Sequence, residues 1–152
     1  MPSPKPPEHD NRGILAASDP PPHPFDAAAE SYDRDVAENP SLRWMRADNL
    51  RCLDRVLPRE GFVLEIGAGT GEEAEALVRA GRSVVALEPS AGMRVRLDAR
   101  AARLAATPAP PGAGVLRVLP LAAETLAGAH MEEAPFTSAY ASLGPLNCVA
   151  DL

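Results

Sequence analysis

The chain has 152 residues, which suits one domain of ordinary size and is short for two. Hydrophobic residues make up 45% of it, so a packed core is possible, but no apolar run has the length of a membrane span. The net charge of −6 gives no electrostatic reason to approach nucleic acid.

The first segment, residues 1–24, is rich in proline and polar groups. Such a segment cannot bury enough apolar surface to offset its ordering entropy, so we predict a disordered leader there and one domain over residues 25–152. It lacks the basic and long apolar regions of a signal peptide, which favours a cytoplasmic protein. Cys52 and Cys148 lack the spacing of metal ligands, so we expect reduced thiols and no metal site.

Two helices are predicted next. The alanine-rich stretch over 25–38 should be helical and should end before Pro40, because the residue preceding a proline resists helix. A second helix is expected over 41–57, with Ser41 as its N-cap and Pro58 close behind its end. Its mostly apolar stripe at helical spacing comprises Leu42, Met45, Asn49, Cys52, Leu53, Val56 and Leu57.

Strands and helices then alternate. Strands are predicted over 62–66, 83–88, 114–119 and 137–143, and helices over 71–80 and 91–106, with Ser90 as the cap of the second. A short turn or helix is expected over 123–127. This alternation predicts right-handed crossovers and a mostly parallel sheet, so the fold class is α/β, a Rossmann-like doubly wound sheet preceded by two helices.

A glycine-rich loop directly follows the first predicted strand, in the stretch VLEIGAGTGEEAEAL (63–77). Gly67 and Gly69 would let the backbone turn tightly and lie against a ligand. Gly71 begins the next helix, where free amide groups can bind an anion such as a carboxylate. In doubly wound sheets this edge holds the ligand.

The choice of ligand depends on the acids around the loop. A dinucleotide loop favours G-x-G-x-x-G and a phosphate loop needs a following lysine, whereas here Glu72 follows Gly71 and Glu73 comes next. Both acids would repel a pyrophosphate. Glu88, at the end of the second strand, can accept hydrogen bonds from ribose hydroxyls, and fits an NAD or an S-adenosylmethionine site equally. Glu65, ahead of the glycines, suits a ligand with an ammonium or sulfonium group.

The segments VLEIGAGTG and VVALEPSAGM together resemble the first two motifs of the class I S-adenosylmethionine-dependent methyltransferases. FDAAAESYD (25–33) is similar to the N-terminal lid helix of small-molecule members, and the stretch over 136–152 is similar to the fourth strand and the loop after it. The resemblance implies the first four parallel strands, in the order 3-2-1-4, of a seven-stranded fold.

The same resemblance implies a role for each matching position. Glu65 and the loop backbone would hold the methionine part of S-adenosylmethionine, Glu88 would hold the ribose, and Met93 would pack near the adenine. Tyr32 would help to close the site, and the stretch from Leu143 to Asn147 would line the pocket where donor and acceptor meet. No catalytic residue is implied. The residues assigned to the cofactor are Glu65, Gly67, Ala68, Gly69, Gly71, Glu88, Pro89, Met93, Ala123 and Glu124.

The chain departs from the family at two places that matter. Many members have an acidic residue that reads the adenine where this chain has Ala122, so that contact would come from the backbone or from Glu124. The chain also stops at Leu152, after the fourth strand. We therefore expect a fragment that binds donor without turnover, with an exposed edge on strand four that invites self-association.

Three functions stay open on the sequence. The first is a methyltransferase that acts on a small-molecule acceptor, without nucleic acid or membrane as partner. The second is a non-catalytic S-adenosylmethionine-binding or interaction module. The third is a fragment of an NAD-type dehydrogenase, which Glu65 and Glu72 disfavour.

Overall fold

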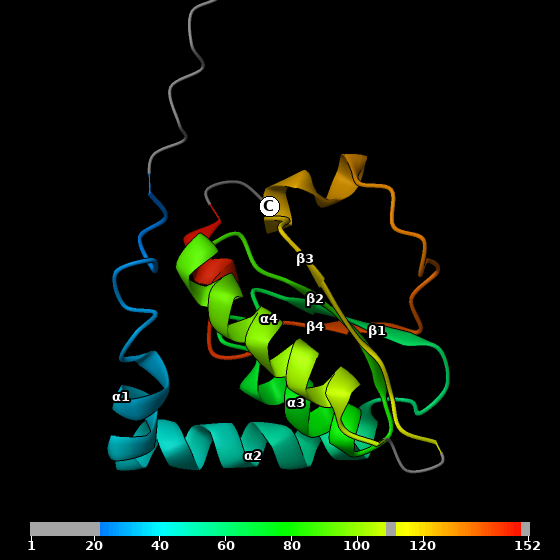
Figure 1. The fold of residues 1–152 in the computed structure, drawn as a ribbon, viewed down its shortest axis with the longest axis horizontal. Coiled ribbons are helices and arrows are strands. Elements are labelled where there is room, and N and C mark those ends of the chain that lie inside the picture. Colours follow the sequence, from blue (N-terminus) through cyan, green and yellow to red (C-terminus); the bar gives the residue numbers. More distant parts are fainter. Residues whose placement is uncertain (1–21, 109–111, 150–152) are drawn as a thin grey trace, which may run out of the picture.

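The computed structural model describes residues 22–108 and 112–149 (Figure 1). Four parallel strands form one sheet in the order β3-β2-β1-β4, which confirms the predicted α/β class and strand order. The strands are β1 (Phe62–Ile66), β2 (Ser83–Leu87), β3 (Leu116–Leu119) and β4 (Ser138–Tyr140). The helices are α1 (Tyr32–Glu38), α2 (Pro40–Val56), α3 (Glu72–Arg79) and α4 (Ala91–Ala106), with the 3-10 turns η1 (Ala123–Gly128) and η2 (Pro145–Cys148).

The two faces of the sheet are covered differently. Helices α3 and α4 lie over one face, and α2 packs beside α3 (Figure 1). Side chains alternate along a strand, so Val63, Val84 and Ala86 meet Leu77 and Leu97 on this face. On the opposite face, hydrophobic residues of the segment between β3 and β4 cover Leu64, Val85 and Leu87; they are Leu121, Leu126, Met131 and Phe136.

The helix predicted over 25–38 is shorter than expected, because only Tyr32–Glu38 is α-helical and the residues before it form successive turns. Asp26 explains the difference. Its carboxylate accepts hydrogen bonds from the Ser90 hydroxyl (2.6 Å) and the Gly92 amide (2.9 Å), at the start of α4. These contacts between distant parts of the chain outweigh the helix propensity of the alanines. Most of the predicted leader, residues 1–21, lies outside the described residues.

Helix α2 begins earlier than predicted, and the prediction that Ser41 caps it is wrong. The N-cap is Asn39, whose side-chain oxygen accepts from the amides of Ser41 (3.0 Å) and Leu42 (3.2 Å). Pro40 takes the first helical position, where its missing N–H costs nothing.

The predicted apolar stripe of α2 matches the packed face only in part. Leu53 and Leu57 pack in the core as predicted. Met45 and Val56 are instead 45% and 71% exposed, and Arg46, which was not in the stripe, is buried. The inner face of α2 meets the first turn of α3, which carries two glutamates, so an arginine occupies its centre. The prediction missed Arg46 because hydrophobic spacing gives no weight to a buried charge.

The remaining boundaries agree more closely with expectation. The Ser90 hydroxyl caps α4 by accepting from the Met93 amide (3.1 Å), and Gly81 follows α3 in a left-handed conformation (φ 89°). Strand β4 is shorter than predicted, with left-handed Leu143 and Gly144 soon after its end. Its exposed edge is therefore short, and self-association through it stays a prediction. None of the helices in the described ranges is long and apolar enough to cross a membrane.

Candidate functional site

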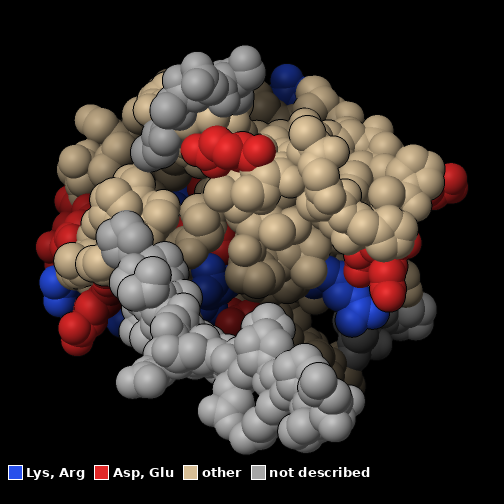
Figure 2. Space-filling view, turned by 90° about the horizontal axis from the view of Figure 1, so that it is seen from above, with Lys and Arg blue, Asp and Glu red and all other residues tan. Residues whose placement is uncertain are grey.

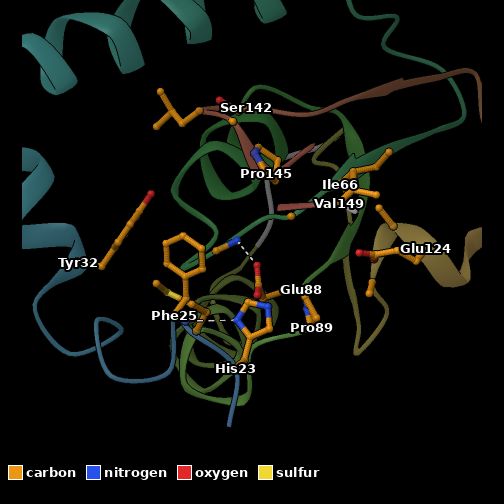
Figure 3. A pocket seen from close by; sticks show the side chains of 17 residues that line it. His23, Phe25, Tyr32, Ile66, Glu88, Pro89, Glu124, Ser142, Pro145 and Val149 are labelled. Carbon is orange, nitrogen blue, oxygen red and sulfur yellow. Dashed lines mark hydrogen bonds between the residues drawn. The ribbon is translucent and has the colours of Figure 1, made fainter. Parts of the chain in front are cut away.

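A cavity of about 420 Å³ opens at the carboxyl ends of all four strands (Figure 3). Its volume lies within the range of small-molecule sites, and its position is the one where open parallel sheets hold ligands. In Figure 3, Tyr32 and Glu124 stand on opposite sides, with Ser142 and Pro145 on a third side and His23 and Phe25 on a fourth. The wall consists of His23, Phe25, Tyr32, Ile66, Gly67, Gly69, Glu88, Pro89, Met93, Ala122, Ala123, Glu124, Ser142, Leu143, Gly144, Pro145 and Val149.

The glycine loop forms the floor between β1 and α3. Gly67 and Gly69 both have positive φ angles, 68° and 58°. A side-chain carbon at Gly67 would collide with Pro145, so this glycine allows the loop after β4 to pack closely. A side-chain carbon at Gly69 would meet no atom within 4 Å, although this residue lines the cavity. Gly69 is thus the position where a ligand can approach the backbone.

Glu88 is fixed by the protein's own backbone. The residue is 5% exposed; one carboxylate oxygen accepts from the Gly69 amide (2.7 Å) and the other from the Ser90 amide (2.8 Å). Each carboxylate oxygen has a second lone pair, so the group can still accept hydrogen bonds from a ligand in the cavity. Its orientation is set before any ligand binds.

Glu65 lies apart from the cavity wall. It shares its sheet face with Val63, on the side covered by helices, and is only 1% exposed. Its Oε2 atom has no hydrogen-bond partner within the described part of the chain. Burial raises the pKa of Glu65 to about 8, and the negative charges of Glu73 and Glu88 add to the shift.

We expect Glu65→Gln to change how stability depends on pH. An acid whose pKa is raised from 4.5 to about 8 on folding keeps its proton in the folded state, so wild-type stability falls as pH rises through this window. The slope from this one group is at most about 1.4 kcal/mol per pH unit. Urea unfolding of both proteins between pH 5 and 9 measures this dependence. The free energy of unfolding of the variant, relative to that of wild type, should rise toward pH 9. Parallel profiles would show that Glu65 is ionised at neutral pH.

An ion-pair cluster holds α2 against the glycine loop. Arg46 binds Glu73 through Nε (2.8 Å) and Glu72 through Nη1, at the first turn of α3. The side chains of Arg46 and Glu73 are 8% and 5% exposed, so this pair is shielded from water. It supports the helix start that follows the loop.

The segment before α1 contributes wall residues that the sequence analysis missed. His23 was placed in the leader and Phe25 in a helix, yet both line the cavity, with their rings stacked at 5.9 Å between centroids. Asp26 fixes this segment, since its carboxylate also accepts from the His23 amide (2.8 Å). The hydrogen bonds from Ser90 and Gly92 hold the pKa of Asp26 below its usual value. No local sequence pattern signals these contacts.

The loops after β3 and β4 complete the wall. Ala122 lines the cavity where many methyltransferases have an acid, and Glu124 lies two residues further on. Leu143 has a φ of 57°, a left-handed conformation that is rare for a bulky residue. Asn147 is exposed and lies outside the wall.

The structure thus brings together many of the residues that the sequence singled out, and their roles in binding stay predictions. The predicted residues in the wall are Tyr32, Gly67, Gly69, Glu88, Pro89, Met93, Ala123, Glu124 and Leu143. Those outside it are Glu65, Ala68, Gly71 and Asn147. Of the wall residues not predicted, Ile66 and Ser142 directly adjoin predicted positions, while Val149 follows η2.

The charge of the wall is one-sided. Glu88 and Glu124 carry carboxylates, and none of the described residues that line the cavity is a lysine or an arginine. Figure 2 shows that charged side chains are sparse on the face seen from above. Within the described ranges, no three His, Cys, Asp or Glu residues are grouped so as to hold a metal ion. The cavity suits a neutral or cationic ligand better than one with phosphates.

Two curated relatives, from Geobacillus kaustophilus and Geobacillus thermodenitrificans, are each named an uncharacterized methyltransferase. They are 42% and 40% identical to this chain over 72 residues, which is 46% of the chain and 34% of each relative. The chain thus covers about a third of the length of the curated relatives that it matches. No family model matches the chain. The relatives confirm the resemblance to methyltransferases that the motifs indicated.

The fold is also similar to the crystal structure of the glycopeptide N-methyltransferase MtfA, which is 23% identical, with a TM-score of 0.49. The likeness covers 68% of this chain and 44% of that chain. MtfA complexed with S-adenosyl-L-methionine is 24% identical, with a TM-score of 0.47, and the likeness covers 68% of this chain and 42% of that one.

Proposed function

We propose that this domain binds S-adenosylmethionine and belongs to a methyltransferase that acts on a small molecule. One observation carries the proposal: the cavity at the carboxyl ends of the strands brings together Gly69, whose backbone is open to a ligand, and the fixed carboxylate of Glu88. The described residues of its wall include no lysine or arginine. The relatives named methyltransferase support it.

The chemistry of the wall fits this cofactor. Glu88 would accept hydrogen bonds from the ribose hydroxyls with its remaining lone pairs, and the Gly69 backbone would lie against the ligand. An acidic wall favours the positively charged sulfonium and disfavours a pyrophosphate, which would need cationic partners. The residues therefore fit S-adenosylmethionine better than a dinucleotide.

When bound, the cofactor supplies a methyl group that its sulfonium sulfur has already activated. The protein's task is to bind, orient and exclude water, since proximity and orientation can lower a barrier by about 7–11 kcal/mol. Apolar wall residues such as Phe25, Pro145 and Val149 would exclude water. The net charge of −6 supports a small-molecule acceptor over a nucleic acid. We assign no catalytic residue, and the cytoplasmic location stays a prediction.

Calorimetric titration of S-adenosylhomocysteine into the purified chain tests the proposal. We expect a one-site isotherm in the micromolar range, and no heat from NAD under the same conditions. Binding of NAD without binding of S-adenosylhomocysteine would overturn the proposal in favour of a dehydrogenase-type site.

A matched pair of glycine variants tests, by the same titration, whether the ligand binds in the cavity. Gly69→Ala and Gly112→Ala both place a side chain at a positive φ with open space around it, so both should cost roughly 1–2 kcal/mol of stability. Of these two glycines, Gly69 lines the cavity and Gly112 does not. We expect at least about a tenfold loss of affinity for Gly69→Ala, which is 1.4 kcal/mol, and none for Gly112→Ala. Equal affinities of the two variants would contradict the placement of the ligand on the glycine loop.

A further inference from the structure

A chain of hydrogen bonds connects the segment before α1 to the acid of the cavity. The Asp26 carboxylate accepts from the His23 amide through Oδ2 and from the Ser90 hydroxyl through Oδ1. Ser90 in turn donates its backbone amide to Glu88, which also accepts from Gly69. Asp26 is therefore linked through one residue to the carboxylate that faces the ligand.

The same carboxylate holds two side chains of the wall. His23 and Phe25 form their stacked pair immediately before Asp26, and Figure 3 shows His23 beside Glu88 and Pro89, with Phe25 on the side toward Tyr32. The segment also fits tightly on α4, because a side-chain carbon at Gly92 would lie 2.9 Å from the backbone oxygen of Asp26. Hydrogen bonds and close packing thus fix the segment at the same point.

We propose that Asp26 is a positioning residue of the cavity: it holds the His23–Phe25 pair in the wall and, through Ser90, fixes the carboxylate of Glu88. This inference rests on the proposed function for the identity of the ligand. Asp26 itself is not in the wall, so its effect on binding must pass through these neighbours.

Titration of S-adenosylhomocysteine into Asp26→Ala tests the inference, with Asp35→Ala as the control. Asp35 is an exposed acid on α1, and its replacement changes the net charge equally without touching the network. We expect roughly a tenfold or greater loss of affinity for Asp26→Ala and less than about a twofold change for Asp35→Ala. Asp26→Asn keeps an oxygen for Ser90 and Gly92, so it should recover part of the affinity.

A double-mutant cycle with Glu88→Gln distinguishes positioning from general stability. Because part of the effect of Asp26 passes through Glu88, Asp26→Ala should weaken binding by a smaller factor in the Glu88→Gln background than in wild type. Full multiplication of the two losses, or wild-type affinity for Asp26→Ala with only a lower melting temperature, would overturn the inference.

Gly92→Ala gives a second route if Asp26→Ala fails to fold. It keeps every side chain of the network and favours helix α4, but its methyl group must displace the backbone of Asp26. A cooperative melt with roughly tenfold weaker binding is expected, and unchanged binding would contradict the inference. If wild type does not bind S-adenosylhomocysteine, the proposed function fails; if wild type binds and these variants bind equally well, only the role of Asp26 fails.

Discussion

Replacing Arg46 by methionine is expected to lower the free energy of unfolding by about 3–5 kcal/mol, because it leaves the buried carboxylate of Glu73 without its partner. The side chains of Arg46 and Glu73 are both less than one-tenth exposed, and their hydrogen bond of 2.8 Å joins α2 to the start of α3. Urea unfolding at pH 7, followed by circular dichroism, measures the loss.

Two further variants identify the cause. Arg51 on the same helix pairs with Asp48 at the surface, so Arg51→Met should cost less than about 1 kcal/mol. Adding Glu73→Gln to Arg46→Met removes the unpaired charge and should restore part of the stability. A double variant as unstable as Arg46→Met alone would show that the loss comes from packing of the arginine stem and not from the uncompensated charge.

Glu88→Gln should weaken the binding of S-adenosylhomocysteine by roughly 10- to 150-fold, which corresponds to a charge-assisted hydrogen bond of about 1.5–3 kcal/mol. The Glu88 carboxylate faces the cavity and accepts hydrogen bonds from two backbone amides. In the glutamine variant the side-chain NH₂ would face one of these amide N–H groups, so that hydrogen bond would be lost. The measurement is calorimetric titration, with the melting temperature recorded alongside.

Glu124→Gln provides the comparison for Glu88→Gln. It removes the other carboxylate of the wall, which is exposed and makes no hydrogen bond to the glycine loop. If charge alone attracted the ligand, both variants would lose similar affinity. A larger loss for Glu88→Gln than for Glu124→Gln is expected if Glu88 contacts the ribose, while unchanged affinity in a folded Glu88→Gln variant would refute that assignment.

The sequence predicted the features that local patterns encode. Alternating strands and helices indicated a parallel sheet, and the resemblance to methyltransferases implied its strand order. The glycine loop with Glu88 indicated the edge where the cavity lies. Ser90 was predicted correctly as a cap because its hydrogen bond to the Met93 amide spans only three residues. In each case the residues that determine the feature lie close to it in the sequence.

The features that escaped prediction depend on residues far apart in the sequence. Asp26 bonds Ser90 and Gly92 across 64 and 66 positions, and these contacts place His23 and Phe25 in the wall. Arg46 faces inward because it forms ion pairs with two glutamates of α3, and hydrophobic spacing cannot reveal such pairs. Glu65 is buried on the helix-covered side of the sheet, outside the cavity wall, and its contact with the ligand stays a prediction.

The hydrogen bond from Gly69 to Glu88 should keep the glycine loop ordered when no ligand is bound. Because its amide is already engaged at 2.7 Å, the Gly69 N–H should exchange slowly with deuterated water in the ligand-free protein. A loop that is ordered before the ligand binds loses little conformational entropy on binding. More of the interaction free energy therefore contributes to affinity. Affinity differences among related nucleosides should then appear mainly in their dissociation rates, with similar association rates for all of them.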